Sequence, residues 1–333
     1  SMFAAQDRKG NYYLVGTTSS TQFGFSDKDW LVAKFSPAGA RLWYRTFNGK
    51  GNGGDIPGGI VVDRLGNVIV CGYTTGVAQE GSAGAVVKWD SNGNRKYVRY
   101  SPGTASAGFE YDDYRAIAVD YLNNIYVTGA KTGAPATGVD LLVEKLSPAL
   151  TPIWSKTWSQ TGSPQIEQGL SLDLHANGTV FIGGDAPTQN QMAGGFWVYS
   201  SQGANTKFIR YLGKDGFGRV SRVRAMGNRV YVFGDIRGTG FLNNEGTLFS
   251  NAYTSSGSVI YNRLTIGNST VSRNSIEGAV GPDGSFANFC TTSIGGSQAD
   301  TLTQRVLFGP GGVFSRMTSA NLPNPAYAEG GFL

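Results

Sequence analysis

Aromatic and acidic side chains are interleaved in one short segment that could bind a ligand. The segment reads Phe109, Glu110, Tyr111, Asp112, Asp113 and Tyr114. Aromatic planes stack on the faces of sugar rings, and carboxylates accept hydrogen bonds or coordinate calcium. Loops of this composition also cap strands, so the segment is either a ligand-binding loop or a structural one. Calcium is the one cofactor that this pattern leaves open, and we expect no other.

Arginines form a second group with the same two interpretations: Arg219, Arg222, Arg224 and Arg229. Arg222 and Arg224 fall on one face of an expected strand, and a buried guanidinium requires a carboxylate partner. Asp185 and Asp235 stand at matching points of neighbouring repeats, so we expect them to be these partners. Because a guanidinium fork suits a structural ion pair and an anionic ligand equally well, both roles stay open.

Most established catalytic residue sets have no support in the sequence. The chain has 1 histidine, His175, which falls in an expected turn and cannot build a histidine-rich zinc site. No G-x-S-x-G elbow surrounds a serine that could act as a nucleophile. Hydrolysis of a glycoside requires only two carboxylates, about 5 to 10 Å apart, so it stays open. We therefore assign no catalytic and no metal-binding residue from the sequence.

A repeat of roughly 55 residues must position these side chains. Its clearest copies are GGIVVDRLGNVIVCGYTTG at 58–76 and RAIAVDYLNNIYVTGAKTG at 115–133. Weaker copies begin near positions 2, 170, 221 and 277. In each copy, short apolar runs are bounded by Gly, Asn, Asp and Ser, which predicts strands joined by tight turns. In the second copy, strands are expected at 59–62, 68–73, 85–89 and 95–100.

This pattern predicts an all-β chain, a six-bladed β-propeller of four-stranded antiparallel blades. The blades are expected at 2–50, 57–101, 114–158, 168–213, 220–265 and 277–322, within a single domain spanning 1–333. Residues 323–333 are expected at ring closure, where they compete with residues 2–6 for an innermost strand. A seven-bladed ring and a fragment of a longer array are the alternatives. Innermost strands are expected to include 60–62, 117–119 and 170–172.

Several residues recur at fixed places in the repeat. Glycine ends the expected second strand in five copies, at Gly16, Gly72, Gly129, Gly184 and Gly234, where a missing side chain permits a bulge or a close backbone approach. Lysine recurs in the third strand, at Lys34, Lys88 and Lys145, and we expect these side chains to snorkel along the blade, with the charged end in water, rather than to form a basic ligand patch. Cys71 and Cys290 occupy nearly equivalent places in copies that are not neighbours. They lie beyond the roughly 7 Å between Cα atoms that a disulfide can span, so we predict buried, reduced thiols.

The first three copies resemble a known repeat family. They contain WYRTFNG from Trp43, Asp55, GIVVD ending at Asp63 and GNVIVCG ending at Gly72. Asp29, Asp140 and Asp300 open third strands, and Trp43 and Trp154 come late in the repeat. In these features the chain resembles the bacterial β-propeller repeats called SBBP, with an NHL-like strand order. The resemblance implies a secreted or cell-surface bacterial protein whose repeats share no catalytic residues.

Charge and hydropathy limit the expected partners. The net charge is +5, from 28 Lys and Arg against 23 Asp and Glu. The basic residues show no clustered aromatic and basic motif, so we expect no nucleic-acid partner. No run approaches the roughly 18 apolar residues of a membrane span, so we expect no membrane insertion. A mild positive field suits anionic polysaccharide surfaces, and we expect a monomer outside the cell or on its surface.

Two functions follow from these expectations. The first is a non-catalytic binding or scaffold module that presents loops at the mouth of the channel to a glycan or a protein partner. The alternative is a propeller enzyme that acts on carbohydrate as a carboxylate-based hydrolase or lyase. The candidate ligand-binding residues lie in segments expected to lead into innermost strands: Phe109, Glu110, Tyr111, Asp112, Asp113, Tyr114, Trp158, Asp215, Phe217 and Arg219.

Overall fold

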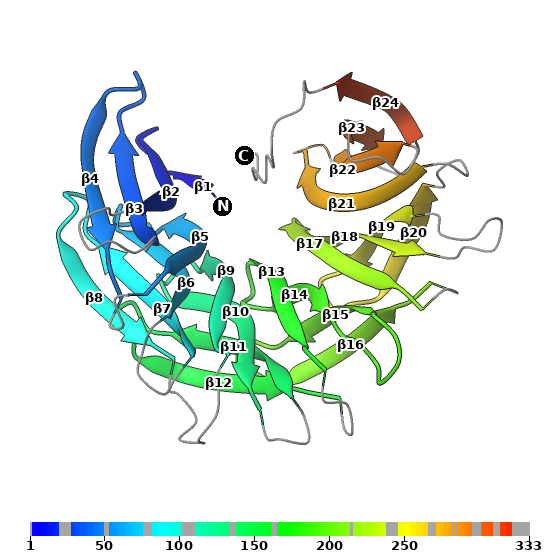
Figure 1. The fold of residues 1–333 in the computed structure, drawn as a ribbon, viewed down its shortest axis with the longest axis horizontal. Helices are drawn as coiled ribbons and strands as arrows, with labels where there is room; N and C mark the ends of the chain where they lie inside the picture. The colour runs from blue at the N-terminus through cyan, green and yellow to red at the C-terminus, as the bar shows by residue number, and fades with distance from the viewer. Residues whose placement is uncertain are drawn as a thin grey trace. The chain divides into compact units, whose positions relative to one another are not determined.

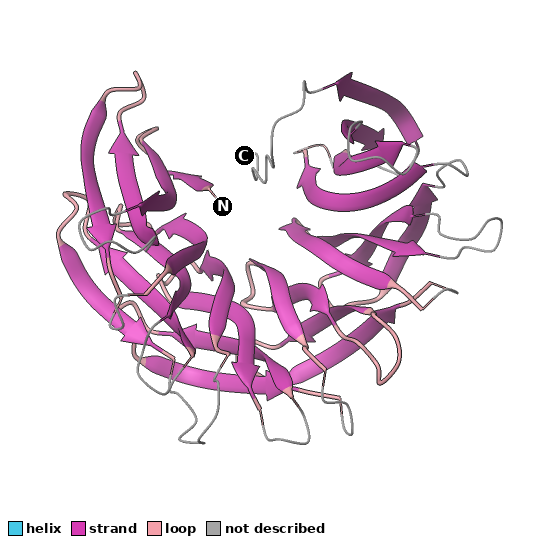
Figure 2. Ribbon diagram, viewed as in Figure 1, coloured by secondary structure: helices cyan, strands magenta, loops and turns pink. Residues whose placement is uncertain are grey.

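The described part of the chain consists of strands joined by turns. A computed structural model describes residues 2–19, 28–49, 53–75, 81–101, 111–133, 138–160, 165–213, 216–237, 246–265, 271–281, 283, 285–294, 301–308 and 314–321. All the secondary-structure elements in these ranges are strands (Figure 2). They fall into two compact units, the first holding β1 to β12 and the second β13 to β24.

The first unit contains three four-stranded antiparallel sheets (Figure 1). Its first sheet is β1 (Phe3–Gln6), β2 (Tyr12–Ser19), β3 (Lys28–Phe35) and β4 (Arg41–Phe47). Its second is β5 (Asp55–Val62), β6 (Val68–Thr75), β7 (Ser82–Trp89) and β8 (Arg95–Tyr100). Its third is β9 (Asp113–Val119), β10 (Ile125–Thr132), β11 (Val139–Leu146) and β12 (Pro152–Trp158).

The second unit repeats this arrangement in three further sheets. They are β13 (Gln168–Leu174), β14 (Val180–Asp185), β15 (Gly194–Tyr199) and β16 (Asn205–Tyr211), then β17 (Gly218–Met226), β18 (Arg229–Arg237), β19 (Gly246–Thr254) and β20 (Val259–Thr265), then β21 (Val271–Val280), β22 (Phe286–Ile294), β23 (Thr301–Phe308) and β24 (Phe314–Asn321).

These sheets confirm an all-β chain of four-stranded antiparallel repeats. The four strands predicted in the second copy are β5 to β8, each at least as long as expected. Residues 60–62, 117–119 and 170–172 lie in the first strands of their sheets, as predicted. Residues 2–6 provide the first strand of the first sheet, β1, whereas the expected closure segment 323–333 lies outside the described residues.

The recurring glycines permit a close approach between first and second strands. A Cβ added to Gly72 would lie 2.2 Å from the Ile56 carbonyl oxygen, and one added to Gly129 would lie 2.2 Å from that of Asp113. Beside each of these glycines the register of the first strand shifts by one residue, which is a β-bulge. The predicted bulge or close approach is therefore confirmed at both positions.

Apolar side chains join each sheet to the next within a unit. In the first unit, Trp30 of the first sheet and Trp89 of the second belong to one buried cluster. Val86 of the second sheet and Tyr114 of the third belong to another. In the second unit, Phe196 packs in a cluster with the third-strand Phe249 of the following sheet. Burial of these faces is the main source of stability for a repeat architecture.

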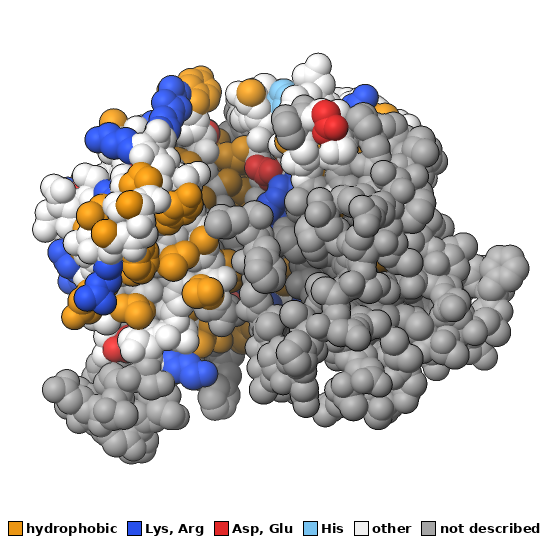
Figure 3. Space-filling view, turned by 90° about the horizontal axis from the view of Figure 1, so that it is seen from above, with side chains coloured by type: hydrophobic (Ala, Val, Ile, Leu, Met, Phe, Trp, Pro, Cys, Tyr) orange, Lys and Arg blue, Asp and Glu red, His pale blue; other side chains and the backbone are white. Residues whose placement is uncertain are grey.

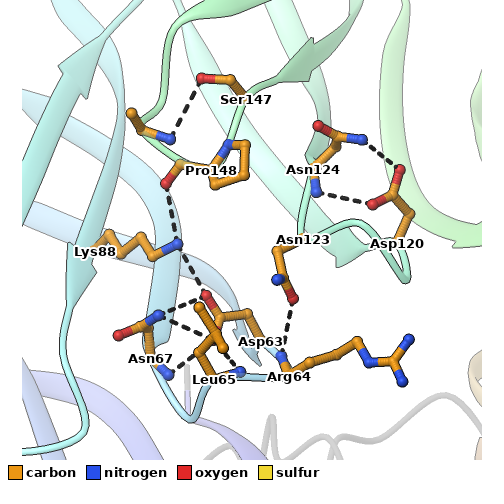
Figure 4. A network of polar contacts seen from close by, with 11 residues as sticks. Asp63, Arg64, Leu65, Asn67, Lys88, Asp120, Asn123, Asn124, Ser147 and Pro148 are labelled. Carbon is orange, nitrogen blue, oxygen red and sulfur yellow. Dashed lines mark hydrogen bonds and ion pairs between the residues drawn. The ribbon is translucent and has the colours of Figure 1, made fainter.

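Buried lysines add polar links between consecutive sheets of the first unit. The Lys88 ammonium lies 2.9 Å from a carboxylate oxygen of Asp63 and donates to the carbonyl oxygen of Pro148 in the third sheet (Figure 4). Lys34 makes the equivalent bond from the first sheet, to the carbonyl oxygen of Ser91 in the second. The predicted snorkelling is wrong for Lys34 and Lys88, because both residues are buried and their ammonium groups bind carbonyl or carboxylate oxygens of the protein.

Asp63 also shapes its own turn. Its carboxylate accepts hydrogen bonds from the backbone amides of Leu65 and Asn67 and from the Asn67 side chain (Figure 4). These bonds and the Lys88 charge hold the pKa of Asp63 below its usual value, against an opposing effect of burial. Asp90 organises the β7–β8 turn in the same way but makes none of the described ion pairs.

Replacing Asp63 by Asn should therefore destabilise the protein far more than Asp90→Asn. We expect Asp63→Asn to lower the free energy of unfolding by about 3 kcal/mol, because Lys88 is left buried without its counter-charge. Asp90→Asn alters only a turn, and we expect a loss of about 1 kcal/mol. Urea unfolding of both variants measures the difference. Equal losses would show that the buried Asp63–Lys88 ion pair adds no stability beyond that of the turn.

Cys71 is fully buried, as predicted, between the second and third sheets. Burial, together with the charge of Asp113, raises the pKa of its thiol. The Cys290 side chain lies outside the described residues, so its predicted burial stays a prediction.

A Cys290→Ser variant isolates the reactivity of Cys71. We expect a thiol reagent to modify this variant slowly in native buffer and stoichiometrically after unfolding without reductant, because the thiolate is disfavoured in the interior. Rapid labelling of the native variant would contradict the buried position of Cys71.

Candidate functional site

The predicted ligand-binding residues divide between the two units. Tyr111, Asp112, Asp113, Tyr114 and Trp158 lie in the first unit, and Phe217 and Arg219 lie in the second. Phe109, Glu110 and Asp215 lie outside the described residues. Convergence of all ten on one rim stays a prediction.

Asp112 holds three strands together. Its side chain is buried, with one carboxylate oxygen accepting from the Thr132 amide of β10 at 3.0 Å. The other oxygen accepts from the Ser101 hydroxyl, directly after β8, at 3.0 Å. The Ser101 hydroxyl in turn accepts from the Gly84 amide of β7. This carboxylate therefore joins the second and third sheets.

Asp113 and Tyr114 are also buried and bonded within the protein. One Asp113 oxygen accepts from the Ala130 amide at 2.9 Å and the other from Nε of Arg115 at 2.6 Å. Burial raises the pKa of Asp113, and the Arg115 charge partly offsets this effect. The Tyr114 hydroxyl donates to Glu144 at 2.5 Å, and Glu144 is paired with Arg99 of β8 at 3.1 Å.

Tyr111 and Arg115 form the partly exposed end of this network. An Arg115 Nη2 atom donates to the Tyr111 hydroxyl at 2.6 Å, while Arg115 Nε holds Asp113. Tyr111 is 40% exposed, and its amide donates to the Thr132 hydroxyl. Burial and the charge of Asp113 raise the pKa of Tyr111. Tyr73 of the second sheet lies close enough for its own pKa to respond to these charges.

Sequence reasoning missed Arg115 as a site residue. It occupies the bulge of β9, the position that Gly58 fills in β5. A bulge can redirect the side chain of the extra residue, and here that residue carries a guanidinium. The available signal was the alignment of the two clearest repeats, in which an arginine replaces a glycine beside the aromatic and acidic segment.

The sequence placed Trp158 in a connection that leads to an innermost strand, and this prediction is wrong. It is the last residue of β12, the outermost strand of its sheet, and pairs with Leu141 of β11. The hairpin pairing extends to the tryptophan, so the expected loop begins later in the chain. Trp158 therefore occupies the outermost strand, whereas Asp113 and Arg115 lie on the first strand of the same sheet.

In the second unit, Arg219 contacts Asp185, an acid that the sequence suggested for Arg222 and Arg224. Its Nε lies 3.7 Å from Asp185, whose other oxygen accepts from the Gln168 side chain at 2.6 Å. Phe217 is half-buried and forms an isolated bridge with Met192. This arrangement supports a structural role for Asp185, because it connects β13, β14 and β17.

Asp173 is the acid that sequence reasoning missed for Arg222 and Arg224. It lies on β13, and its carboxylate accepts from the Ala225 amide of β17 at 2.9 Å. Burial raises its pKa, while hydrogen bonds and the charges of both arginines lower it. The pairing of Arg222 and Arg224 with Asp185 and Asp235, which the repeat alignment suggested, stays a prediction.

The described residues offer hydrogen bonding and stacking rather than metal chemistry. They contain no group of three or more His, Cys, Asp or Glu side chains arranged to hold a metal ion. His175 lies in the predicted turn, where its amide donates to Thr179. Within the described ranges, no helix has the length and hydrophobicity needed to cross a membrane.

Sequence comparison gives no relatives, but structural comparison identifies the fold. The chain matches no protein-family model and no curated protein. The β-propeller domain of the Trilobed protease from Pyrococcus furiosus, described as having an open velcro topology, aligns with a TM-score of 0.50 and 9% identity over 96% of this chain and 94% of that one. An acylaminoacyl peptidase in complex with Z-Gly-Gly-Phe-chloromethyl ketone aligns with a TM-score of 0.50 and 8% identity over 95% of this chain and 51% of that one.

A member of the DUF4221 family from Bacteroides vulgatus aligns with a TM-score of 0.46 and 11% identity, over 87% of this chain and 86% of that one. Together with the four-stranded sheets, the similarity to the Pyrococcus furiosus domain shows a β-propeller fold. At such low identity the similarity concerns the fold alone, because one fold supports many functions.

Proposed function

We propose that this chain is a non-catalytic binding or scaffold module that presents loops of a β-propeller to a glycan or a protein partner. The observation that carries the proposal is the Tyr111–Arg115 pair, a partly exposed phenol and guanidinium held by a buried network. An aromatic plane beside a fixed hydrogen-bond donor is the combination that polar ligands such as sugars require.

The acids of the site support binding over hydrolysis. A carboxylate-based glycosidase needs two carboxyl groups that face the substrate. Asp112 and Asp113 are both buried, and each uses both of its oxygens to hold neighbouring strands or Arg115. Their rigidity favours a preformed binding surface, because residues that are already ordered lose little entropy when a ligand binds.

We propose a propeller of six blades, one for each four-stranded sheet. Every sheet consists of four consecutive strands, so the ring would close without a sheet that combines strands from both ends of the chain. We further propose an SBBP-type, monomeric module at the bacterial cell surface, in line with the repeat motifs.

One observation keeps a hydrolase or lyase as the second candidate. The pKa of Asp113 is raised, and a protonated carboxyl group can act as a general acid. Incubation with the glycans that the protein binds, followed by measurement of new reducing ends, decides between the two functions. Release that disappears in Asp113→Asn would favour the enzyme, and no release would favour the binding module.

Truncation of Tyr111 tests the proposed site. On a glycan array, we expect Tyr111→Ala to weaken binding by about 1–3 kcal/mol, the range typical of an aromatic anchor. Tyr111→Phe keeps the ring and loses only the hydroxyl, so we expect a loss of about 1 kcal/mol. Tyr121→Ala is the matched control, because Tyr121 is 63% exposed in the β9–β10 turn at the far end of β9.

Binding that is unchanged in Tyr111→Ala, or reduced equally in Tyr121→Ala, would place the ligand elsewhere. The melting temperature of each variant serves as the folding control. The same comparison with Arg219→Gln tests whether the second unit contributes to the same ligand.

A further inference from the structure

The outermost strands of the sheets carry basic residues and no acidic ones. Each of β4, β8, β12, β16, β20 and β24 contains at least one Lys or Arg, and none contains Asp or Glu. The chain as a whole has 28 basic and 23 acidic residues, so this separation of charge is not a consequence of composition. This separation is hard to see in the sequence, because consecutive outermost strands are about 55 residues apart, one repeat length.

In the first unit these charges are exposed to solvent. Arg41 and Arg45 of β4, Arg95 and Lys96 of β8, and Lys156 of β12 are all exposed. Arg99 is the exception, because it is mostly buried and paired with Glu144. The strands β4, β8 and β12 each pair on one side only and lie along the outside of the first unit (Figure 1). Figure 3 shows lysine and arginine side chains beside apolar ones on the side of the view that holds the first sheet.

A groove runs between β4 and the turn that precedes β8. It is lined by basic, aromatic and polar residues and by no acid: Arg41, Trp43, Tyr44, Arg45, Ser91 and Asn92 are among them. Asp90, at the start of that turn, accepts hydrogen bonds from Asn92 and Asn94 within the turn itself. The groove therefore presents positive charge to any molecule that enters it.

Both arginines of the groove lie against aromatic rings. The Arg45 guanidinium is also held by the carbonyl oxygens of Gly93 at 2.8 Å, Tyr44 at 2.7 Å and Asn92 at 3.4 Å, and it lies 5.8 Å from the centre of the Trp43 ring. The Arg41 guanidinium lies 5.2 Å from the centre of the Tyr44 ring. A guanidinium that stacks on a ring can still donate in its plane to a carboxylate or sulfate group, so Arg41 offers its donors to a ligand, whereas Arg45 mainly contributes charge.

We propose that β4, β8 and the β7–β8 turn form a second binding surface, which binds linear acidic polysaccharides. Charge complementarity selects a polyanion, and the extended line of basic strands suits a linear one. Single-stranded nucleic acid fits less well, because its bases need open aromatic faces for stacking. Here guanidinium groups already lie over the Trp43 and Tyr44 rings. This surface is independent of the loop that carries Tyr111.

Charged residues on edge strands also have a purely protective use. Lysine and arginine at a free sheet edge discourage pairing with another chain. That use requires charge but no particular ligand, so it predicts no preference among polymers and no effect of position. The experiment must therefore compare the loss of the same positive charge at two different places on the protein.

Binding to purified polymers tests the proposal on the full chain. The probes are polygalacturonate for carboxylate groups, heparin for sulfate groups, dextran as the neutral control and oligo(dT) for nucleic acid. The test variant is Arg41→Gln/Lys96→Gln. The matched control is Arg8→Gln/Lys9→Gln, which removes the same charge from exposed residues in the β1–β2 turn. Melting temperatures confirm that both variants are folded.

We expect wild type to bind polygalacturonate, heparin or both, with affinity that falls as salt is added. The test variant should bind about tenfold more weakly, and the control variant should bind like wild type. Absence of binding to both acidic polymers would overturn the proposal, as would equal losses in the two variants. Tighter binding of oligo(dT) than of either polysaccharide would assign the surface to nucleic acid instead. Tyr111→Ala assigns each loss of affinity to one surface: a loss found in Arg41→Gln/Lys96→Gln but not in Tyr111→Ala supports the surface proposed here, and a loss confined to Tyr111→Ala overturns it.

Discussion

A four-stranded sheet cannot remove both of its faces from water by itself, and this constraint governs the residues that recur along the chain. Trp30 and Trp89 meet across one interface because each sheet must cover its neighbour. A charged group can enter such an interface only with partners, and Lys88 finds them in Asp63 and the Pro148 carbonyl group. The recurring glycines serve the same end, since they let the first strand bulge toward the second. What repeats in this sequence is therefore the means of stacking sheets.

The candidate site arises where the stacking residues of one repeat differ from those of the others. In β9, the bulge that Gly58 occupies in β5 holds Arg115, and the segment before it supplies Asp112, Asp113 and Tyr114. Both carboxylates already make their hydrogen bonds within the protein, because Asp113 orients Arg115 and Asp112 joins the second sheet to the third. Arg115 and Tyr111 remain at the surface as a preorganised pair. Binding and stability thus draw on the same network.

Sequence predicted the strands better than the site. Alternating apolar residues and Asp-initiated turns such as 63–67 depend on neighbours in the chain, so they located β5 to β8 closely. Arg115 and Asp173 were missed because their roles depend on contacts between sheets, which sequence spacing does not encode. Trp158 was assigned to a loop because its hairpin pairing continues beyond the last clear apolar alternation. The basic surface of the outer strands was not predicted for a related reason, because its residues come together only when the sheets stack.

In the proposed site, Asp112 and Asp113 hold neighbouring strands, while Tyr111 and Arg115 contact the ligand. A crystal structure of the protein with the strongest ligand from the glycan array tests this most directly. The account predicts ligand density against the Tyr111 ring and the Arg115 guanidinium, with Asp113 still accepting from the Ala130 amide and Asp112 from the Thr132 amide. Ligand bound directly to either carboxylate, with these amide bonds broken, would contradict it.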